Sequence, residues 1–279
     1  DVARTSVLLV RGEDGAIRAW HNVCPHRGNK LVPETGNETF GRAPKNLLWC
    51  RFHGWVFKPT GECVTVPRRE AFGALPQECT TLKPIACDVW EGFVFVHLAA
   101  TPTQSLAEFL GGIGAHFSGY PYGDSGTAYR YSSVLNCNWK VAMYAFTEGY
   151  HVPTIHRPTL PSLAVLQHDG FRCFGPHSTS TLYVPLPKTF RPTPATGVFA
   201  ARLAGSATHG PRLQELPPDI NPARRADFQF EFPSFFPNFV LHLCAGNGYP
   251  GMTWFSHQFW PLAHDRTLWE GINYFRTPR

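Results

Sequence analysis

The chain has 279 residues, of which 43% are hydrophobic and 14% aromatic, and its formal charge is +5. This composition supports a folded core and excludes a disordered chain. The scattered Lys and Arg residues exclude the clustered basic face of a nucleic-acid binder. No apolar run approaches the roughly 18 residues that a membrane helix needs. No charged-then-apolar leader is visible, so we expect a cytoplasmic location.

Residues 1–98 consist of short β-rich runs separated by turns. Runs of β-branched and aromatic residues bounded by Gly, Pro, Asp or Asn predict strands. They lie at residues 6–10, 17–23, 56–57, 63–66 and 90–98, and residues 46–49 lead into the second of two metal-like loops. The run at 90–98 is almost wholly apolar, which predicts a buried strand. The pattern predicts an all-β domain over residues 1–98.

Residues 99–279 mix helices and strands. A short helix is predicted at 106–110 and a strand at 129–135. Residues 139–150 contain no proline, which predicts a helix, and Pro153 should end it because proline lacks the amide donor and clashes with the preceding turn. Residues 185–225, rich in Pro, Gly and Ala, predict a long surface loop. Aromatic-rich strands are predicted at 228–243, 252–260 and 269–275. The expected fold class is α+β, with a curled sheet in the second domain.

Two segments each combine one cysteine with one histidine: Cys24-x-His26 and Cys50-x2-His53. Thiolates suit iron–sulfur clusters and zinc, and imidazole suits iron and zinc. A Rieske [2Fe-2S] cluster takes two Cys on one iron and two His on the other. Two loops that each present one ligand of each kind can therefore hold it between them. Structural zinc sites usually pair cysteine with cysteine; a zinc site and unliganded core residues are the alternatives.

The other cysteines show no paired spacing. We expect reduced, mostly buried thiols, because free cysteine behaves as a small hydrophobe. These residues are Cys63, Cys79, Cys87, Cys137, Cys173 and Cys244.

A second group of candidate ligands lies near the middle of the chain, where His151 and His156 follow Glu148. With Pro153 between them, both imidazoles are expected near one end of a helix. Two histidines and one carboxylate with open positions form the facial triad of non-haem Fe(II) oxygenases. Taken alone, two nearby histidines are a weak signal, and an incidental pair is the alternative.

These segments resemble one family. Cys24-Pro25-His26-Arg27-Gly28 and Cys50-Arg51-Phe52-His53-Gly54-Trp55 resemble the cluster loops of ring-hydroxylating and related Rieske oxygenases, and Asn138-Trp139-Lys140 with Glu148, Tyr150, His151 and His156 resembles their iron-site signature. The resemblance is to the large (alpha) subunit of aromatic-ring-hydroxylating dioxygenases. Residues 33–46 are interpreted as an insertion between the loops, and Asn29 and Arg51 stand where respiratory Rieske proteins carry a further cysteine pair.

The resemblance implies a Rieske domain followed by a helix-grip (START-like) catalytic domain with a mononuclear Fe(II). It also implies a homotrimer or an α3β3 assembly, and electrons from an NAD(P)H-dependent reductase with or without a ferredoxin. Glu148 is implied to join an iron-ligand histidine to the Rieske histidine of a neighbouring subunit. Many ring-hydroxylating members have Asp at this position, and Glu also occurs in amine-oxidising relatives. Tyr144 is a second departure from the pattern, because ring dioxygenases often place Asn there, close to the iron.

The function expected first is hydroxylation or dihydroxylation of an aromatic or other hydrophobic substrate, as in aromatic hydrocarbon catabolism. The alternatives are oxidative demethylation of an amine or methyl ether and, more remotely, pure electron transfer. Phenylalanines are candidates for an apolar substrate wall, with ordinary core packing as the alternative: Phe228, Phe230, Phe232, Phe235, Phe236 and Phe239.

The third iron ligand is the remaining question. In the family it is an aspartate on a late helix, and the chain stops at Arg279 soon after its last predicted strand. Both ends look cut, so we expect a fragment with His151 and His156 facing an open gap. Carboxylates within the chain are alternatives: Asp219, Asp227, Glu231, Asp265 and Glu270. Asp265 is expected in a hairpin turn that faces solvent.

Overall fold

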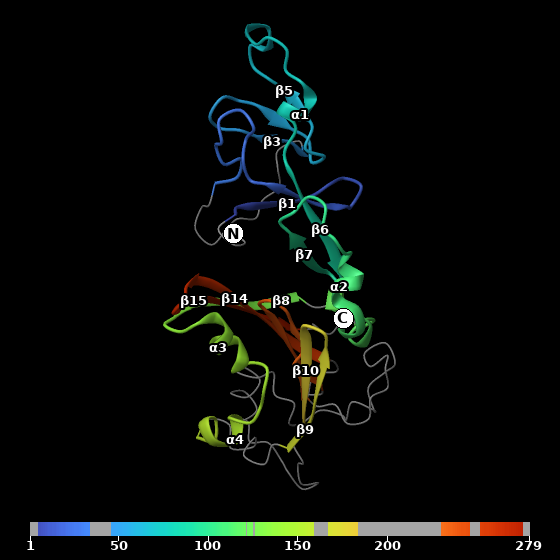
Figure 1. Ribbon diagram of the computed structural model, residues 1–279, viewed down its shortest axis with the longest axis vertical. Helices are drawn as coiled ribbons and strands as arrows, with labels where there is room; N and C mark the ends of the chain where they lie inside the picture. The colour runs from blue at the N-terminus through green and yellow to red at the C-terminus, as the bar shows by residue number, and fades with distance from the viewer. Residues whose placement is uncertain are drawn as a thin grey trace. The chain divides into compact units, whose positions relative to one another are not determined.

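The computed structural model describes residues 5–33, 46–120, 122–124, 126–158, 167–183, 230–245 and 252–275. The chain forms two compact units, Asp1–Phe109 and Leu110–Arg279 (Figure 1). The segments interpreted as an insertion and as a long loop, residues 33–46 and 185–225, lie almost wholly outside the described residues. In the described part of the chain, no helix is long and apolar enough to cross a membrane.

Two antiparallel sheets build the first unit. The larger sheet has the strand order β1-β2-β6-β7 and the smaller one the order β3-β4-β5. The strands are β1 Val7–Arg11, β2 Ile17–His21, β3 Leu48–Trp49, β4 Val56–Phe57, β5 Cys63–Thr65, β6 Pro84–Trp90 and β7 Phe93–His97. A 3-10 turn, η2 (Arg69–Ala71), and a one-turn helix, α1 (Gln77–Thr80), separate β5 from β6. The predicted β architecture of this unit is confirmed.

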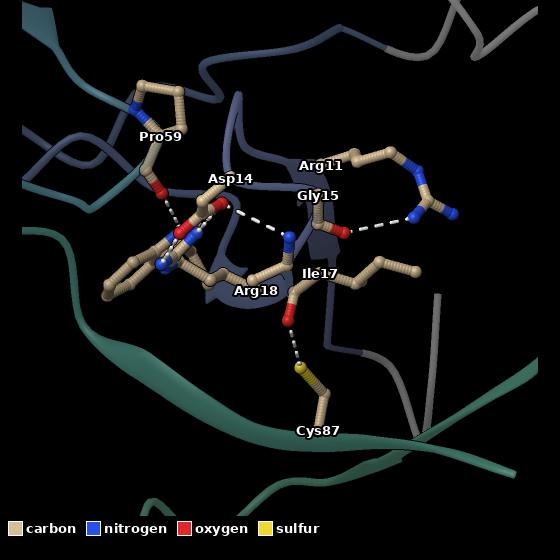
Figure 2. A network of polar contacts seen from close by, with 9 residues as sticks. Arg11, Asp14, Gly15, Ile17, Arg18, Pro59 and Cys87 are labelled. Atoms are coloured by element: carbon tan, nitrogen blue, oxygen red, sulfur yellow. Dashed lines mark hydrogen bonds and ion pairs between the residues drawn. The ribbon is translucent and has the colours of Figure 1, made fainter.

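The β1–β2 hairpin shows turn chemistry that is readable from the sequence. Gly15 has a φ of 77°, a conformation that glycine adopts without steric cost. The Asp14 carboxylate pairs with the Arg18 guanidinium at 2.6 Å. The Arg11 side chain donates a 3.1 Å hydrogen bond to the carbonyl of Gly15 (Figure 2). These local bonds set the register of the first two strands.

Two further bonds attach this hairpin to neighbouring segments. The Cys87 thiol on β6 donates to the carbonyl of Ile17 at 3.4 Å (Figure 2). The Trp20 indole donates to the carbonyl of Pro59 at 3.1 Å. Its ring lies so close to Gly61 that a Cβ there would stand 2.6 Å from the indole. Trp20 therefore needs glycine at position 61.

The segment predicted as one buried strand at 90–98 is part of a hairpin instead. β6 ends at Trp90, Glu91 and Gly92 turn the chain with positive φ, and β7 begins at Phe93. The residues of β7 are half-buried or exposed rather than buried. The apolar run concealed the turn, and β6 was missed because its Pro84 and Asp88 are residues depleted in strands.

The second unit is built on one eight-stranded antiparallel sheet. Its order is β11-β10-β12-β13-β14-β15-β8, and β9 pairs with β10. The strands are β8 Gly126–Leu135, β9 Gln167–Phe174, β10 His177–Tyr183, β11 Phe230–Glu231, β12 Ser234–Phe235, β13 Phe239–Ala245, β14 Met252–Ala263 and β15 Arg266–Phe275. The described chain from Leu106 onward also forms three helices and one 3-10 turn: α2 (Leu106–His116), η3 (Tyr122–Asp124), α3 (Trp139–Tyr144) and α4 (Val152–Ile155). The α+β prediction is confirmed.

The helix α3 is capped by a side chain at its start and packs against the sheet through apolar residues. The side chain of Asn138 accepts a 3.0 Å hydrogen bond from the amide of Lys140, which satisfies a free amide of the first turn. Ala142 and Met143 then pack against Val240 and Phe259 of the sheet. Figure 1 shows α3 and α4 joined by a short irregular segment.

Two helix predictions are wrong in their bounds. The helix predicted at 139–150 ends at Tyr144, and Pro153 does not end a helix but lies in the first turn of α4, where its missing amide would have no helical partner. The helix predicted at 106–110 continues to His116 because Gly111 accommodates a kink, with φ 48° and ψ −128°. Glycine can adopt this backbone conformation and residues with a side chain rarely do.

The cysteines outside the two metal-like loops are less buried than expected. The described ones are free thiols; Cys63, Cys87 and Cys137 are half-buried, and Cys79 and Cys173 are exposed. Cys63 and Cys137 pack at the margins of two hydrophobic clusters, Cys87 lies on the interior strand β6, and Cys79 and Cys173 lie in α1 and on the edge strand β9. The expectation of mostly buried thiols is therefore wrong for this part of the chain.

Candidate metal sites

The two cluster loops have the same backbone structure. In each, the cysteine amide donates to the carbonyl five residues later, and the amide four residues later donates back to the cysteine carbonyl. The bonds are Cys24 N to Asn29 O (2.8 Å), Gly28 N to Cys24 O (3.0 Å), Cys50 N to Trp55 O (2.8 Å) and Gly54 N to Cys50 O (2.9 Å). Gly28 and Gly54 both have positive φ, 73° and 75°, which explains the glycine four residues after each cysteine.

The four predicted ligands lie together at the tips of these loops. Cys24 and Cys50 are buried, with 1% and 2% of their surfaces exposed. The rings of His26 and His53 lie 4.5 Å apart between centroids. The Nδ1 atom of His26 is buried and has no hydrogen-bond partner among the described residues. A buried imidazole nitrogen without a partner is costly, and metal ligation would satisfy it, so this donor set fits a Rieske cluster.

The two sulfur atoms differ in their surroundings. Burial raises the pKa of the Cys24 thiol to about 11, against the opposing effect of the His26 amide. Burial also raises the pKa of Cys50, but hydrogen bonds from the amides of Phe52 and His53 outweigh it, so the pKa of Cys50 is lowered. Donors aimed at sulfur stabilise the thiolate, which is the form that binds iron.

Aromatic packing distinguishes the two histidines. The ring of His26 stacks on the buried indole of Trp55, with centroids 5.0 Å apart and planes 1° from parallel. His53 is exposed and lies beside Phe52, which is itself 59% exposed. His26 is therefore fixed by the core of the unit, whereas His53 faces the surface.

The second pair of histidines flanks the helix α4. His151 is its N-cap and His156 its C-cap, and their ring centroids lie 5.1 Å apart. The prediction placed both at one end of a helix, whereas they bracket a single turn. The two imidazoles are thus brought together by the single turn of α4 between them, and not by a shared helix end.

Glu148 contacts the first histidine of this pair. Its carboxylate binds His151 Nδ1 and accepts from the amides of Tyr150 and His151, the latter at 3.2 Å. Burial raises the pKa of Glu148, but these hydrogen bonds outweigh it and hold the pKa below its usual value. An anionic Glu148 bound at Nδ1 fixes the ring and leaves Nε2 as the nitrogen for a metal.

The candidate third ligands within the described residues are engaged elsewhere. Glu231 is fully buried and pairs with Arg172 at 3.0 Å. Glu270 accepts from the Trp260 indole at 2.7 Å. Asp265 lies in the β14–β15 turn with 65% of its side chain exposed, as predicted.

Asp219 and Asp227 lie outside the described residues. Within the described ranges, no three His, Cys, Asp or Glu side chains are grouped to bind one metal ion. A two-iron cluster is compatible with this, since it needs only two protein ligands on each iron.

The sequence reasoning missed the side chains that hold the segment between α3 and α4. His242 on β13 donates from Nε2 to the carbonyl of Phe146 at 2.8 Å, because a carbonyl can only accept. Ser180 on β10 donates to the carbonyl of Thr147 at 2.8 Å. These carbonyls immediately precede Glu148. A buried histidine or serine at an arbitrary strand position carries no sequence signal for this role.

The buried His257 lies against the half-buried His242. The rings of His242 and His257 are 4.6 Å apart between centroids, and the Trp269 indole donates to His257 Nδ1 at 3.2 Å. Burial lowers the pKa of His242 to about 4 and that of His257 well below its usual value. Both rings are therefore neutral near pH 7.

The phenylalanines predicted to line a substrate wall lie in different surroundings. Phe232 meets the ring of His242 edge-on, with centroids 4.5 Å apart. Phe235 is fully buried and stacks on Phe239, which is ordinary core packing, and Phe236 is 47% exposed. Phe230 lies in β11, and Phe228 lies outside the described residues.

The first unit is a small β domain that carries the two Cys/His loops. The second unit is built on an antiparallel sheet and carries the His151/His156 pair. The Rieske [2Fe-2S] domain model matches residues 1–83, and the model of the ring hydroxylating alpha subunit (catalytic domain) matches residues 123–278. The chain therefore belongs to the family of Rieske ring-hydroxylating alpha subunits. Neither model covers residues 84–122, so the predicted domain boundary after residue 98 stays a prediction.

Curated relatives include enzymes named for amines and for an aromatic hydrocarbon. The carnitine monooxygenase oxygenase subunit of Escherichia coli (strain K12) is 31% identical over 158 residues, which are 56% of this chain and 40% of that protein. Chloroplastic choline monooxygenase of Arabidopsis thaliana is 29% identical over 167 residues, 56% and 38% of the two chains. The large oxygenase component of the Pseudomonas aeruginosa naphthalene 1,2-dioxygenase system is 34% identical over 169 residues, 56% and 35%. These matches span two fifths or less of each relative.

Solved structures share the fold over nearly the whole chain. A quaternary ammonium Rieske monooxygenase in complex with L-carnitine superimposes with a TM-score of 0.71 at 20% identity, covering 100% of this chain and 64% of that one. Naphthalene 1,2-dioxygenase from Rhodococcus sp. bound to indole gives 0.69 at 19% identity, covering 98% and 62%. The predicted order, a Rieske domain before a helix-grip catalytic domain, is confirmed.

Proposed function

We propose that this chain is the greater part of a terminal oxygenase subunit that oxidises a quaternary amine with O2. The observation that carries the proposal is the group of relatives named for carnitine, choline and glycine betaine. The aromatic substrate expected first is supported only in part, by the naphthalene dioxygenase relative. The alternative of an amine substrate therefore takes its place. A pure electron carrier would have no use for the catalytic domain.

The electrostatics of the second unit support a cationic substrate. Burial holds His242 and His257 neutral near pH 7. They lie next to Phe146, two residues before Glu148. A quaternary ammonium bound near Glu148 would meet two uncharged rings rather than imidazolium charges. Glu148, held anionic by its hydrogen bonds, adds a favourable charge.

The ligand assignment is part of the proposal. Cys24, His26, Cys50 and His53 hold the [2Fe-2S] cluster, which their shared position at two matched loop tips and the partnerless Nδ1 of His26 support. His151 and His156 hold the mononuclear Fe(II), which their 5.1 Å ring separation supports. A carboxylate from a part of the subunit beyond the described residues completes that site.

The bound groups supply single electrons and O2 activation, and this chain's residues set their surroundings. Glu148 fixes the tautomer of His151 by binding Nδ1. As a carboxylate it can accept a second N–H, which is how it would join the Rieske histidine of a neighbouring subunit to His151. An NAD(P)H-dependent reductase, with or without a ferredoxin, and a homotrimer or α3β3 assembly complete the proposed system.

A substrate panel tests the proposal. The whole subunit, loaded with iron and supplied with a matching reductase, is assayed with carnitine, choline, glycine betaine and naphthalene. Product formation coupled to NAD(P)H and O2 consumption is expected with at least one of the amines and not with naphthalene. Oxidation of naphthalene in preference to all three amines would refute the amine assignment and restore the aromatic one.

A further inference from the structure

The residue that closes each cluster loop reaches across to the other loop. Asn29 and Trp55 occupy equivalent positions, five residues after Cys24 and Cys50, and their carbonyls accept the cysteine amides. The Trp55 indole stacks on His26 of the opposite loop. The side-chain amide nitrogen of Asn29 lies 3.9 Å from the sulfur of Cys50. Each closing side chain thus contacts a proposed ligand that it does not neighbour in sequence.

The orientation of the Asn29 amide is set by a second bond. Its Nδ2 donates to the carbonyl of Lys30 at 2.8 Å. A carboxamide nitrogen carries two hydrogens, so one N–H is committed to this carbonyl and the other is available to the Cys50 sulfur. The bond to Lys30 also establishes that nitrogen, and not oxygen, faces the sulfur.

The Cys50 sulfur accepts several hydrogen bonds and is almost completely buried. It accepts from the amides of Phe52 and His53 of its own loop and from Asn29 of the other. Cys50 is 2% exposed, and Asn29 is half-buried. In such surroundings a donor aimed at a ligand sulfur has a larger electrostatic effect than it would have in water.

Hydrogen bonds to ligand sulfur are among the factors that set the reduction potential of an iron–sulfur cluster. Reduction of a bound cluster would add one negative charge, which a donor aimed at a ligand sulfur would stabilise electrostatically. A donor stabilises the reduced form more than the oxidised form, so it raises the potential. Loss of the donor should lower it.

We propose that Asn29 is a positioning residue that donates across the loops to Cys50 and raises the reduction potential of the cluster. This rests on the proposed ligand set. The residue transfers no electron itself; the single electron comes from the reductase and leaves toward the mononuclear iron.

The test is a redox titration of the cluster-loaded full chain, followed by electron paramagnetic resonance. Asn29→Leu, of similar size but without donors, should shift the oxidised-to-reduced ratio at a given potential by about threefold to tenfold. The upper limit corresponds to about 59 mV for a one-electron couple. Asn29→Asp, which replaces the donor with a charge, should shift it further in the same direction. Loop distortion alone would not produce this order.

The matched control is Gln77→Leu, which removes an exposed side-chain amide of the same unit at the start of α1; its potential should equal that of the parent. An unchanged potential in Asn29→Leu overturns the proposal. If that variant loads poorly, Asn29→Ala decides, because it removes the donor without adding a charge; an unchanged or higher potential overturns the proposal. Failure of the ligand assignment looks different, because Cys50→Ala would then keep the Rieske signal.

Discussion

The cluster loops close on themselves, whereas the segment that carries Glu148 and His151 is held from outside. Each loop makes two backbone hydrogen bonds with itself, at 2.8 to 3.0 Å. The segment between α3 and α4 also has local hydrogen bonds, but two of its carbonyls are bound by His242 and Ser180, side chains that come from distant strands. A self-closing loop is encoded by a few neighbouring residues, while an externally held one requires the whole sheet to be in place.

The largest expected effect is at the self-closing loops. Cys50→Ala removes one of two proposed thiolate ligands, so the cluster should be lost and with it the Rieske signal in low-temperature electron paramagnetic resonance of the reduced protein. Cys79→Ala is the matched control, because Cys79 is an exposed thiol in the same unit. A Rieske signal that survives Cys50→Ala would show that the ligand assignment is wrong.

The next effect is at Glu148. Glu148→Gln removes the charge that holds His151, so turnover of the whole enzyme should fall by about tenfold to a hundredfold with both metals retained. Glu108→Gln is the control, since Glu108 binds only its own helix start at Ser105 in the contacts described. Iron analysis separates the outcomes. Loss of the mononuclear iron, or unchanged turnover, would contradict the role of Glu148 as a bridge.

His242→Phe tests the external support directly. It leaves the buried carbonyl of Phe146 without this donor, which costs about 1–3 kcal/mol. We expect a lower midpoint of urea unfolding for the second unit and weaker iron binding at His151, with the Rieske signal unchanged. Ser132→Ala, at an exposed position of β8, is the control. Equal iron binding in parent and His242→Phe would show that the segment holds its own shape.

The lowered pKa of His242 also predicts that the stability of the second unit depends on pH. The pKa of His242 falls to about 4 from 6.5 because burial disfavours the charged ring. Between these values the unfolded chain binds a proton that the folded chain does not, so stability is fully present above pH 6.5 and declines as the pH falls to about 4, by about 3 kcal/mol. Urea unfolding at pH 7 and pH 5 measures the slope. His242→Phe should flatten it; an equal slope in that variant would assign the effect to other groups.

The smallest effect is expected at the Asp14–Arg18 pair. Both side chains are partly exposed, 55% and 31%, and exposed ion pairs contribute little because solvent screens them. Asp14→Asn should leave the thermal midpoint of the first unit within error of the parent. A clear drop would mean that this turn, and not the core around Trp20, determines the stability of the hairpin.

This contrast explains which features the sequence could predict. The two Cys/His loops could be predicted from the sequence because the proposed ligands, the glycine and the closing residue all lie within six positions of Cys24 or Cys50. The sequence predicted that His151 and His156 lie close together, and their rings do. The helix predicted before them was too long, because the chain leaves the helix after Tyr144 and Glu148 binds backbone amides. The positions of His242 and Ser180 follow only from strand pairing across the sheet. Likewise the β6–β7 turn was hidden inside a run of apolar residues.

The matched hydrogen bonds of the two loops also bear on how the cluster is assembled. Because the backbone hydrogen bonds within each loop use no metal ligand, they can form before iron and sulfide arrive, and less conformational entropy then remains to be lost on cluster binding. Cluster insertion then resembles the docking of a rigid ligand more than metal-induced folding. In the metal-free chain, the amide hydrogens of Gly28 and Gly54 should already exchange slowly with deuterated solvent.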